Sequence, residues 1–204
     1  VLLSIPLLGG LVRKKILKGL GLDQVIVAGS GSAPIPAELI TWYRKLGLNL
    51  LEGYAMTEDF AYSHNSTTQI NAPGCVGVPL EGVQAKISPE GEILVKSPGQ
   101  MVGYYKRPDL TAEAVINGWL HTGDIGVFEN DIFLKITDRK KELFKTSGGK
   151  YVAPQPIENK CKESQFIEQF MVVGADRKFV GALIVPSFAT LKSWMEEEGI
   201  TYTT

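Results

Sequence analysis

The architecture follows from residues 24–51, QVIVAGSGSAPIPAELITWYRKLGLNLL. The apolar run 24–28 predicts a short buried strand, and the glycine-rich residues 29–34 predict a loop after it. Apolar side chains then recur at helical spacing over 36–46, and a glycine follows as a typical helix stop. The apolar residues 48–51 predict a second strand.

Two strands joined by one helix form a βαβ unit, in which the strands are parallel and the crossover is right-handed. The carboxyl ends of parallel strands lie at one edge of the sheet, where open α/β sheets bind ligands. We therefore expect the loops 29–34 and 53–58 to face each other at that edge. The sequence predicts an α/β fold, with α+β character in places.

Beyond residue 70 the pattern changes to short alternating runs and further helices. The predicted elements are a hairpin of 83–88 and 92–97, a helix over 111–116, a hairpin of 124–128 and 132–136, a helix over 154–163, strands over 170–174 and 180–185, and a helix over 188–198. The charged residues 138–142 (DRKKE) interrupt this series, either as a solvated connection or as a domain hinge. Placing the boundary there predicts domains of residues 1–137 and 138–204.

Composition excludes several classes of protein. The 204 residues are 44% apolar and carry a net charge of −1, which excludes intrinsic disorder. Without a basic excess, nucleic acid is not an expected partner. The longest apolar stretch, Val1–Val12, is interrupted by Ser4, Pro6 and two glycines, and it is shorter than the ~20 residues that cross a bilayer.

The cysteines and histidines do not form a metal site in the sequence. Cys75 and Cys161 are far apart, and only His64 and His121 could join them. A structural zinc site needs about four such ligands at close spacing. We therefore expect two reduced thiols, which favours the cytoplasm.

The loop 29–34 is the first of four segments that could carry chemistry. It runs from a strand into a helix, an arrangement that presents backbone N–H groups to an anion or a flat base. It is not the dinucleotide fingerprint, because Pro34 stands where the third glycine would be. A plain tight turn is the alternative.

The second segment is Leu51–Glu58 (LEGYAMTE), which follows the neighbouring strand. Tyr54 could stack on a planar base. The Thr57 hydroxyl could reach a phosphate oxygen, and the Glu58 carboxylate could hold Mg²⁺. In the alternative interpretation Tyr54 and Met56 are packing residues and Glu58 is a surface charge.

The third segment is Gly118–Gly126 (GWLHTGDIG), in which Asp124 could accept both hydroxyls of a ribose. Its histidine, His121, is expected to be structural. The fourth segment is Lys145–Lys150 (KTSGGK). It lacks the glycine and the hydroxyl residue of a Walker loop, so it is either backbone that passes close to a ligand or a plain basic turn.

In this order, and with Asp138–Glu142 between the third and fourth, the segments resemble successive motifs of the adenylate-forming superfamily. That superfamily includes acyl-CoA synthetases, firefly luciferase and peptide-synthetase adenylation domains. Gly103–Pro108 (GYYKRP) and Ala153–Glu158 (APQPIE) also fit. The resemblance covers nearly the whole chain, and Lys145–Pro186 looks most like long-chain fatty acid:CoA ligases.

The resemblance implies two half-reactions. ATP and a carboxylic acid give an acyl-adenylate and pyrophosphate, and coenzyme A then displaces AMP after the small domain rotates. The implied cofactors are ATP/AMP, Mg²⁺ and coenzyme A, and the implied substrate is a fatty acid. The implied nucleotide-binding residues are Gly31, Ser32, Ala33, Glu52, Gly53, Tyr54, Ala55, Met56, Thr57, Asp124 and Arg139.

The resemblance also implies roles in catalysis and movement. Glu58 would bind the metal, and Thr57, Glu58 and Lys145 would be catalytic. Asp138 would be the hinge. The coenzyme A contacts would come from Lys145, Ser147, Gly148 and Gly149.

Departures from the family pattern lead to further expectations. Ala55 replaces the family's glycine, which puts the fit around the adenine in question. The family's phosphate loop would precede Val1 and its C-terminal catalytic lysine would follow Thr204, so we expect an internal fragment that is inactive in adenylation alone. The residues leave two alternative functions open: a domain that loads an amino or aryl acid onto a carrier protein, and a non-catalytic nucleotide- or acyl-binding module. They also leave open peripheral membrane association and self-association.

Overall fold

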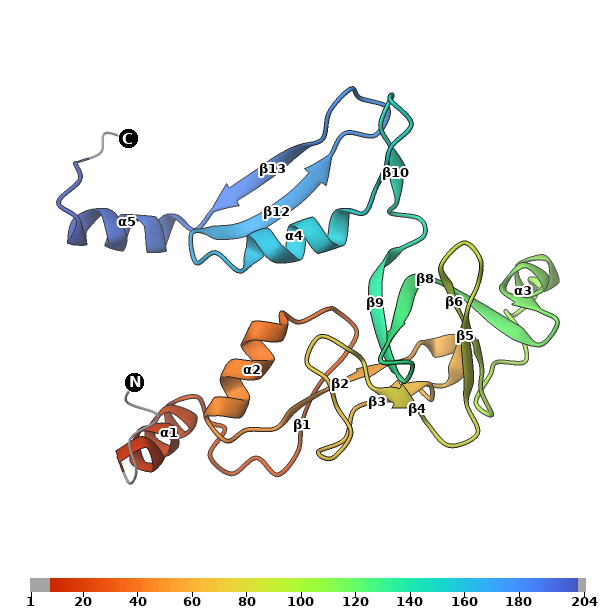
Figure 1. Cartoon of the computed structure of the whole chain (residues 1–204), viewed down its shortest axis with the longest axis horizontal. Helices are drawn as coiled ribbons and strands as arrows, with labels where there is room; N and C mark the ends of the chain where they lie inside the picture. The colour runs from red at the N-terminus through yellow and green to blue at the C-terminus, as the bar shows by residue number, and fades with distance from the viewer. Residues whose placement is uncertain (1–7, 202–204) are drawn as a thin grey trace. The chain divides into compact units, whose positions relative to one another are not determined.

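The structure is a computed structural model that describes residues 8–201 (Figure 1). Its residues form two compact units. The first unit contains the residues up to Thr122 together with Gly126–Ile136, and the second contains Gly123–Ile125 together with the residues from Thr137 onward. Each unit contains both helices and strands, so the mixed α/β fold class is confirmed.

The βαβ unit predicted from residues 24–51 is present in the first unit. Its elements are strand β1 (Ala28–Ser30), helix α2 (Ala37–Lys45) and strand β2 (Leu50–Tyr54). The two strands are parallel, with Gly29 opposite Leu51. The short strands β3 (His64–Asn65) and β4 (Val78–Pro79) extend the sheet antiparallel to β2, in the order β1-β2-β3-β4.

The glycine after α2 ends the helix as expected. Gly47 has a φ of 95°, in the left-handed region that glycine adopts without a steric penalty. Its N–H donates to the carbonyl of Arg44 at 2.9 Å, and the N–H of Leu48 donates to the carbonyl of Tyr43 at 3.1 Å. These two hydrogen bonds form a Schellman motif, which turns the chain toward β2.

The first predicted strand is wrong in position. Residues 24–27 are not in a strand, and Ile26 and Val27 are 98% and 75% exposed. The reason lies in the partner segment, where the N–H of Leu50 donates to the carbonyl of Leu48 at 3.1 Å and bends the chain. No extended backbone therefore lies opposite 24–27, and pairing begins only at Ala28. β2 likewise starts later than the predicted 48–51, and it takes in part of the predicted loop 53–58.

The second sheet of the first unit has the strand order β5-β6-β8-β7, and β9 pairs with β8. Its strands are β5 (Gln84–Ile87), β6 (Glu92–Lys96), β7 (Val115–Ile116), β8 (Trp119–Glu129) and β9 (Phe133–Arg139). Both predicted hairpins are confirmed. The predicted helix over 111–116 is shifted: α3 is Pro108–Ala114, and the next two residues form β7. The β-branched Val115 and Ile116 suit a strand, which a two-residue Asn-Gly turn joins to β8.

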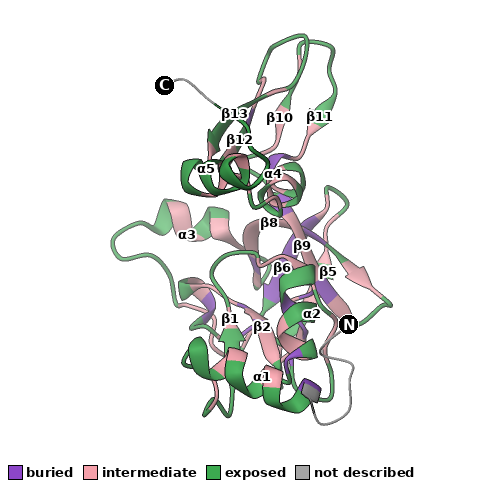
Figure 2. Cartoon of the chain, turned by 90° about the vertical axis from the view of Figure 1, so that its left-hand side faces the viewer, coloured by how far each residue is buried: buried purple, intermediate pink, exposed green. Residues whose placement is uncertain are grey.

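The core of the first unit joins the two sheets. Buried Tyr54, Ile93, Val95 and Leu134 form one cluster, drawn from β2, β6 and β9. The segment before β4 lies very close to β3, since a Cβ built on Gly77 would be 2.1 Å from the backbone of Asn65. Only glycine fits at that position. Figure 2 shows buried positions along β6, β8 and β9, between more exposed loops.

The second unit is a small α+β assembly. Its elements are β10 (Phe144–Lys145), β11 (Tyr151–Val152), α4 (Pro154–Lys162), β12 (Ile167–Val173), β13 (Gly181–Pro186) and α5 (Phe188–Glu197). The two predicted helices and two predicted strands in this part are confirmed. α4 packs on β12, where the Glu158 carboxylate accepts the Val172 N–H at 2.8 Å.

One helix was not anticipated from the sequence. α1 (Leu8–Gly19) contains Arg13, Lys14 and Lys15 within its length. Among residues 8–201 no helix combines the length and apolar character that crossing a membrane requires.

Candidate functional site

The ends of β1 and β2 bring the first two candidate segments together. A Cβ built on Gly31 would lie 3.4 Å from the carbonyl oxygen of Gly53. Gly31, Ser32 and Ala33 are all exposed at this edge. Ser32 has a φ of 67°, an uncommon conformation for a residue with a side chain. The expectation that these loops face each other is therefore confirmed.

The beginning of the second segment points into the protein. Glu52 is 8% exposed, and its carboxylate accepts the backbone N–H of Gly74 at 2.9 Å. Burial raises the pKa of Glu52, although that hydrogen bond opposes the shift. Tyr54 is 9% exposed in the core cluster, and Met56 packs against the same cluster. The structure thus favours packing roles for these residues.

The end of the segment turns outward. Residues Thr57–Asp59 form one turn of 3-10 helix in which Thr57 is exposed and Glu58 is half-buried. Asp59 is completely buried, and its Oδ1 accepts the Met56 N–H at 2.9 Å. Burial raises the pKa of Asp59. This side chain, which the sequence analysis did not select, fixes the turn that presents Thr57 and Glu58.

A second residue missed from sequence contacts Glu58 directly. The phenol of Tyr104 donates to Oε1 of Glu58 at 2.8 Å, and the N–H of Met101 donates to the Glu58 carbonyl at 2.7 Å. These partners lie more than forty residues from Glu58 in the sequence, so no local spacing could indicate them. The pKa of Tyr104 is raised because its hydroxyl donates to the carboxylate.

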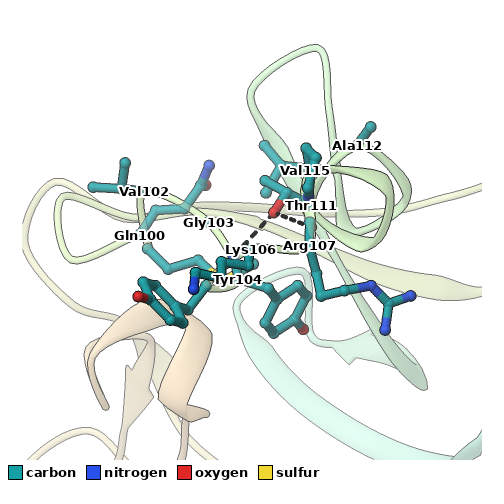
Figure 3. A pocket seen from close by; sticks show the side chains of 12 residues that line it. Gln100, Val102, Gly103, Tyr104, Lys106, Arg107, Thr111, Ala112 and Val115 are labelled. Atoms are coloured by element: carbon teal, nitrogen blue, oxygen red, sulfur yellow. Dashed lines mark hydrogen bonds between the residues drawn. The ribbon is translucent and has the colours of Figure 1, made fainter.

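Tyr104 also borders a hollow of about 730 Å³ on the first unit (Figure 3). The Thr111 hydroxyl stabilises its wall, because it accepts the Tyr104 N–H at 2.9 Å and donates to the Arg107 carbonyl at 3.0 Å. The lining comes from Gln100–Pro108 and from Thr111, Ala112 and Val115. No sequence pattern predicts a hollow here.

The second unit contains the predicted ribose acceptor. Asp124 on β8 lies beside Arg139 on β9, with the guanidinium Nε 3.5 Å from Oδ1. The Asp124 side chain is 13% exposed and that of Arg139 is 60% exposed. The neighbouring backbone is fixed by a hydrogen bond from the Lys140 N–H to the Gly123 carbonyl at 2.8 Å.

Asp138 is not part of a solvated connection, so that interpretation of 138–142 is wrong for this residue. It lies in β9 and is 1% exposed. Its Oδ1 accepts the N–H of Arg139 at 2.7 Å. Burial raises the pKa of Asp138, and the nearby carboxylates of Glu142 and Glu158 act in the same direction.

The fourth segment is the turn between β10 and β11. The N–H of Thr146 donates to the carbonyl of Lys150 at 2.9 Å, and that of Ser147 donates to the carbonyl of Arg177 at 2.9 Å. The Lys145 ammonium lies 4.5 Å from the centre of the Tyr151 ring. Ser147, Gly148 and Gly149 are exposed, so the turn presents them to solvent.

The carboxylates do not cluster into a metal centre built by the protein alone. Within residues 8–201 no three His, Cys, Asp or Glu side chains are grouped so that they could hold an ion. The two predicted thiols are unpaired, with Cys75 buried and Cys161 half-buried.

Comparisons with known proteins agree over both units. A sequence model of the AMP-binding enzyme family matches residues 8–105, and one of the AMP-binding enzyme C-terminal domain matches residues 142–201. The long-chain-fatty-acid–CoA ligase FadD15 of Mycobacterium bovis is 38% identical over 94% of this chain and 32% of its own length. Long chain acyl-CoA synthetase 5 of Arabidopsis thaliana is 35% identical over 96% of this chain and 32% of its own length.

Solved structures show the same fold. The o-succinylbenzoate–CoA synthetase of Bacillus subtilis, in complex with its acyl-adenylate intermediate, is 25% identical with a TM-score of 0.74. That match covers 90% of this chain and 43% of the other.

The chain belongs to the adenylate-forming superfamily of AMP-binding enzymes. It spans about a third of the length of the curated relatives it matches.

Proposed function

We propose that the chain belongs to an ATP-dependent ligase that joins a long-chain fatty acid to coenzyme A. The observation that carries this proposal is the 38% identity to a long-chain fatty-acid–CoA ligase over 94% of the chain. In the first half-reaction a carboxylate oxygen attacks the α-phosphorus of ATP and pyrophosphate leaves. In the second, the thiol of coenzyme A attacks the acyl carbon and AMP leaves.

The first half-reaction brings an anion against a polyphosphate, so it needs neutralising groups. We assign Glu58 to Mg²⁺ and Thr57 to a phosphate oxygen. Mg²⁺ is commonly held by one or two carboxylates together with substrate phosphates. Glu58 is half-buried, and residues 8–201 place no cluster of metal-binding side chains around it, which fits that donor set. When bound, the ion would neutralise phosphate charge, while Glu58 holds it in place.

The nucleoside part of ATP or AMP needs a flat surface and hydroxyl acceptors. Gly31, Ser32 and Ala33 are exposed beside Gly53, which supports a contact with the adenine. Asp124 is an acceptor that could receive both ribose hydroxyls, with Arg139 beside it.

The second half-reaction needs access for a thiol and a change of domain position. The exposed turn Ser147–Gly149 supports a contact with the pantetheine arm of coenzyme A, with Lys145 at its base. Asp138 stays our candidate for the hinge between domains of residues 1–137 and 138–204. A few residues at the end of an element are enough to absorb such a rotation.

The proposal is tested on the complete protein with a panel of carboxylic acids. ATP–pyrophosphate exchange measures the first half-reaction, and consumption of free thiol measures the second. We expect exchange that depends on C16–C18 fatty acids, followed by loss of the coenzyme A thiol.

Other outcomes would select the alternatives. Exchange with aryl or amino acids and no thiol consumption would indicate a domain that loads a carrier protein. Binding of AMP without exchange for any acid would indicate a non-catalytic module. Either result would overturn the proposal that the protein is a fatty-acid–CoA ligase.

A further inference from the structure

A segment distant in sequence holds the turn that presents Glu58. We call Ser97–Tyr104 the strap. At one end the Ser97 hydroxyl donates to the Tyr62 carbonyl at 2.7 Å. In the middle the Met101 N–H donates to the Glu58 carbonyl at 2.7 Å. The strap therefore fixes the backbone within the turn, at Glu58, and shortly after it, at Tyr62.

The strap and the turn are in direct backbone contact. A Cβ built on Gly99 would lie 2.6 Å from the carbonyl oxygen of Asp59, closer than real Cβ atoms approach. The N–H of Gly99 donates a hydrogen bond to the Ser97 hydroxyl at 3.1 Å. A side chain at position 99 would push the strap away from the turn. Glycine there is what permits the close approach.

The last strap residue contacts the Glu58 side chain itself. The Tyr104 hydroxyl donates to Oε1 at 2.8 Å, and Oε2 accepts no hydrogen bond from the residues that the structure describes. Tyr104 is held in turn, because its N–H donates to the Thr111 hydroxyl at 2.9 Å (Figure 3). A glutamate side chain loses much rotational freedom when it is fixed. Here that loss occurs before any ligand arrives.

We propose that Tyr104 is a positioning residue, which orients the Glu58 carboxylate so that its second oxygen can bind the divalent cation of the nucleotide. This inference rests on the proposed function, because it takes Glu58 as the metal ligand. Nothing in the sequence motif around Tyr104 assigned it a role.

A phenol is chemically suited to this task. It donates one hydrogen bond without bringing a positive charge, so Glu58 keeps the full negative charge that attracts a cation. A lysine or arginine at the same place would neutralise the carboxylate. Oε1 of Glu58 accepts this hydrogen bond at 2.8 Å, which leaves Oε2 for the cation.

The test uses Tyr104→Phe in the complete protein, with Tyr105→Phe as the matched control. Tyr105 is the adjacent residue, is 86% exposed, and has its ring 5.2 Å from the Lys106 ammonium. The first readout is the affinity for Mn²⁺ in the presence of α,β-methylene-ATP. Electron paramagnetic resonance measures it through the signal of free Mn²⁺. We expect Tyr104→Phe to weaken Mn²⁺ binding roughly tenfold, the size expected for one hydrogen bond to a charged group. Tyr105→Phe should bind Mn²⁺ like the wild type.

A double-mutant comparison separates positioning from general damage. In a Glu58→Gln background, Tyr104→Phe should have no further effect on Mn²⁺ binding. Equal Mn²⁺ affinity in wild type and Tyr104→Phe would overturn the inference. So would equal weakening by Tyr104→Phe and Tyr105→Phe, because that would indicate a disturbed loop.

The second readout is the Mg²⁺ dependence of pyrophosphate exchange. Tyr104→Phe should raise the Mg²⁺ concentration for half-maximal exchange about tenfold and leave the rate at saturating Mg²⁺ nearly unchanged. An unaltered Mg²⁺ dependence would overturn the inference while the ligase function stands. Absence of exchange in the wild type would instead refute the proposed function, and the Mn²⁺ comparison would still decide the role of Tyr104.

Discussion

Arg139 lies beside Asp124 across the paired strands β9 and β8, with its Nε 3.5 Å from Oδ1 of Asp124. The two side chains differ in exposure to solvent: Asp124 is 13% exposed and Arg139 is 60% exposed. A pair with one solvated partner contributes only ~0–1 kcal/mol to stability. Replacing Asp124 should therefore cost little stability, so an effect on nucleotide binding can be measured in a folded variant.

We predict that Asp124→Asn weakens binding of AMP to the complete protein by roughly tenfold to a hundredfold, the range for hydrogen bonds to a charged group. Isothermal titration calorimetry measures this directly. Asp131→Asn is the control, because Asp131 lies in the turn of the same hairpin and its φ of 61° suits asparagine equally well. Equal AMP affinity in wild type and Asp124→Asn would place the ribose elsewhere.

The turn between β10 and β11 allows a test of the coenzyme A contact. Gly148 is outside the left-handed region, and a Cβ there would meet only the Thr146 hydroxyl, at 3.9 Å. Alanine should therefore fit in the unliganded protein. If pantetheine passes against this backbone, the added methyl should reduce kcat/KM for coenzyme A about tenfold or more, since overpacking costs ~1–3 kcal/mol. Pyrophosphate exchange should stay unchanged.

The neighbouring glycine provides the contrast. Gly149 has a φ of 80°, so Gly149→Ala strains the turn by ~1–2 kcal/mol. It should lower thermal stability as well as thioester formation, whereas Gly148→Ala should lower thioester formation alone. Normal coenzyme A kinetics in Gly148→Ala would contradict a contact at this turn.

Local sequence patterns predicted the helices that carry their own signals. The helices over 36–46, 154–163 and 188–198 were predicted from apolar spacing, a following glycine or an initial proline. Each of these signals lies within the helix or directly beside its end. Strand limits were less accurate. Residues 24–27 have the composition of a buried strand, yet the bend at Leu48–Leu50 leaves them without a partner. Pairing depends on the other strand, which a single stretch of sequence does not describe.

The same limit applies to the candidate site. Glu58 was selected because its segment follows a predicted strand, and Asp124 because a carboxylate can accept both hydroxyls of a ribose. The resemblance supplied their roles. The contact between Tyr104 and Glu58 could not be foreseen, since it depends on how the strap folds back over the turn. Nor could the burial of Asp138, which lies in a run of charged residues that indicates solvent exposure.

His64 provides a test of pH dependence. It is 2% exposed, its Nδ1 lies 2.8 Å from the Ser63 hydroxyl, and burial lowers its pKa from 6.5 to about 4. Between these two values the unfolded chain binds a proton that the folded chain does not. The free energy of unfolding should therefore be fully maintained above pH 6.5 and fall as the pH decreases toward 4.

The measurement is a proton NMR titration of the imidazole signals in the chain of residues 1–204. The chain has two histidines, so His64→Gln and His121→Gln assign both signals. We expect the His64 signal to stay at its neutral position down to about pH 5. Titration of His64 near pH 6.5 would show that its ring contacts water, contrary to its burial.

The two thiols should differ sharply in reactivity. Cys75 is completely buried, and burial together with the Glu129 carboxylate, 3.5 Å from Sγ, raises its pKa to about 11. At pH 8 its thiolate fraction is then on the order of 10⁻³. Cys161 is half-buried on α4. We predict that a disulfide reagent labels Cys161 at least about a hundredfold faster than Cys75 in the native chain. Cys161→Ser should remove the fast phase and Cys75→Ser should preserve it, while denaturant should make both thiols react. A fast phase that persists in Cys161→Ser would mean that the strands around Cys75 open to solvent.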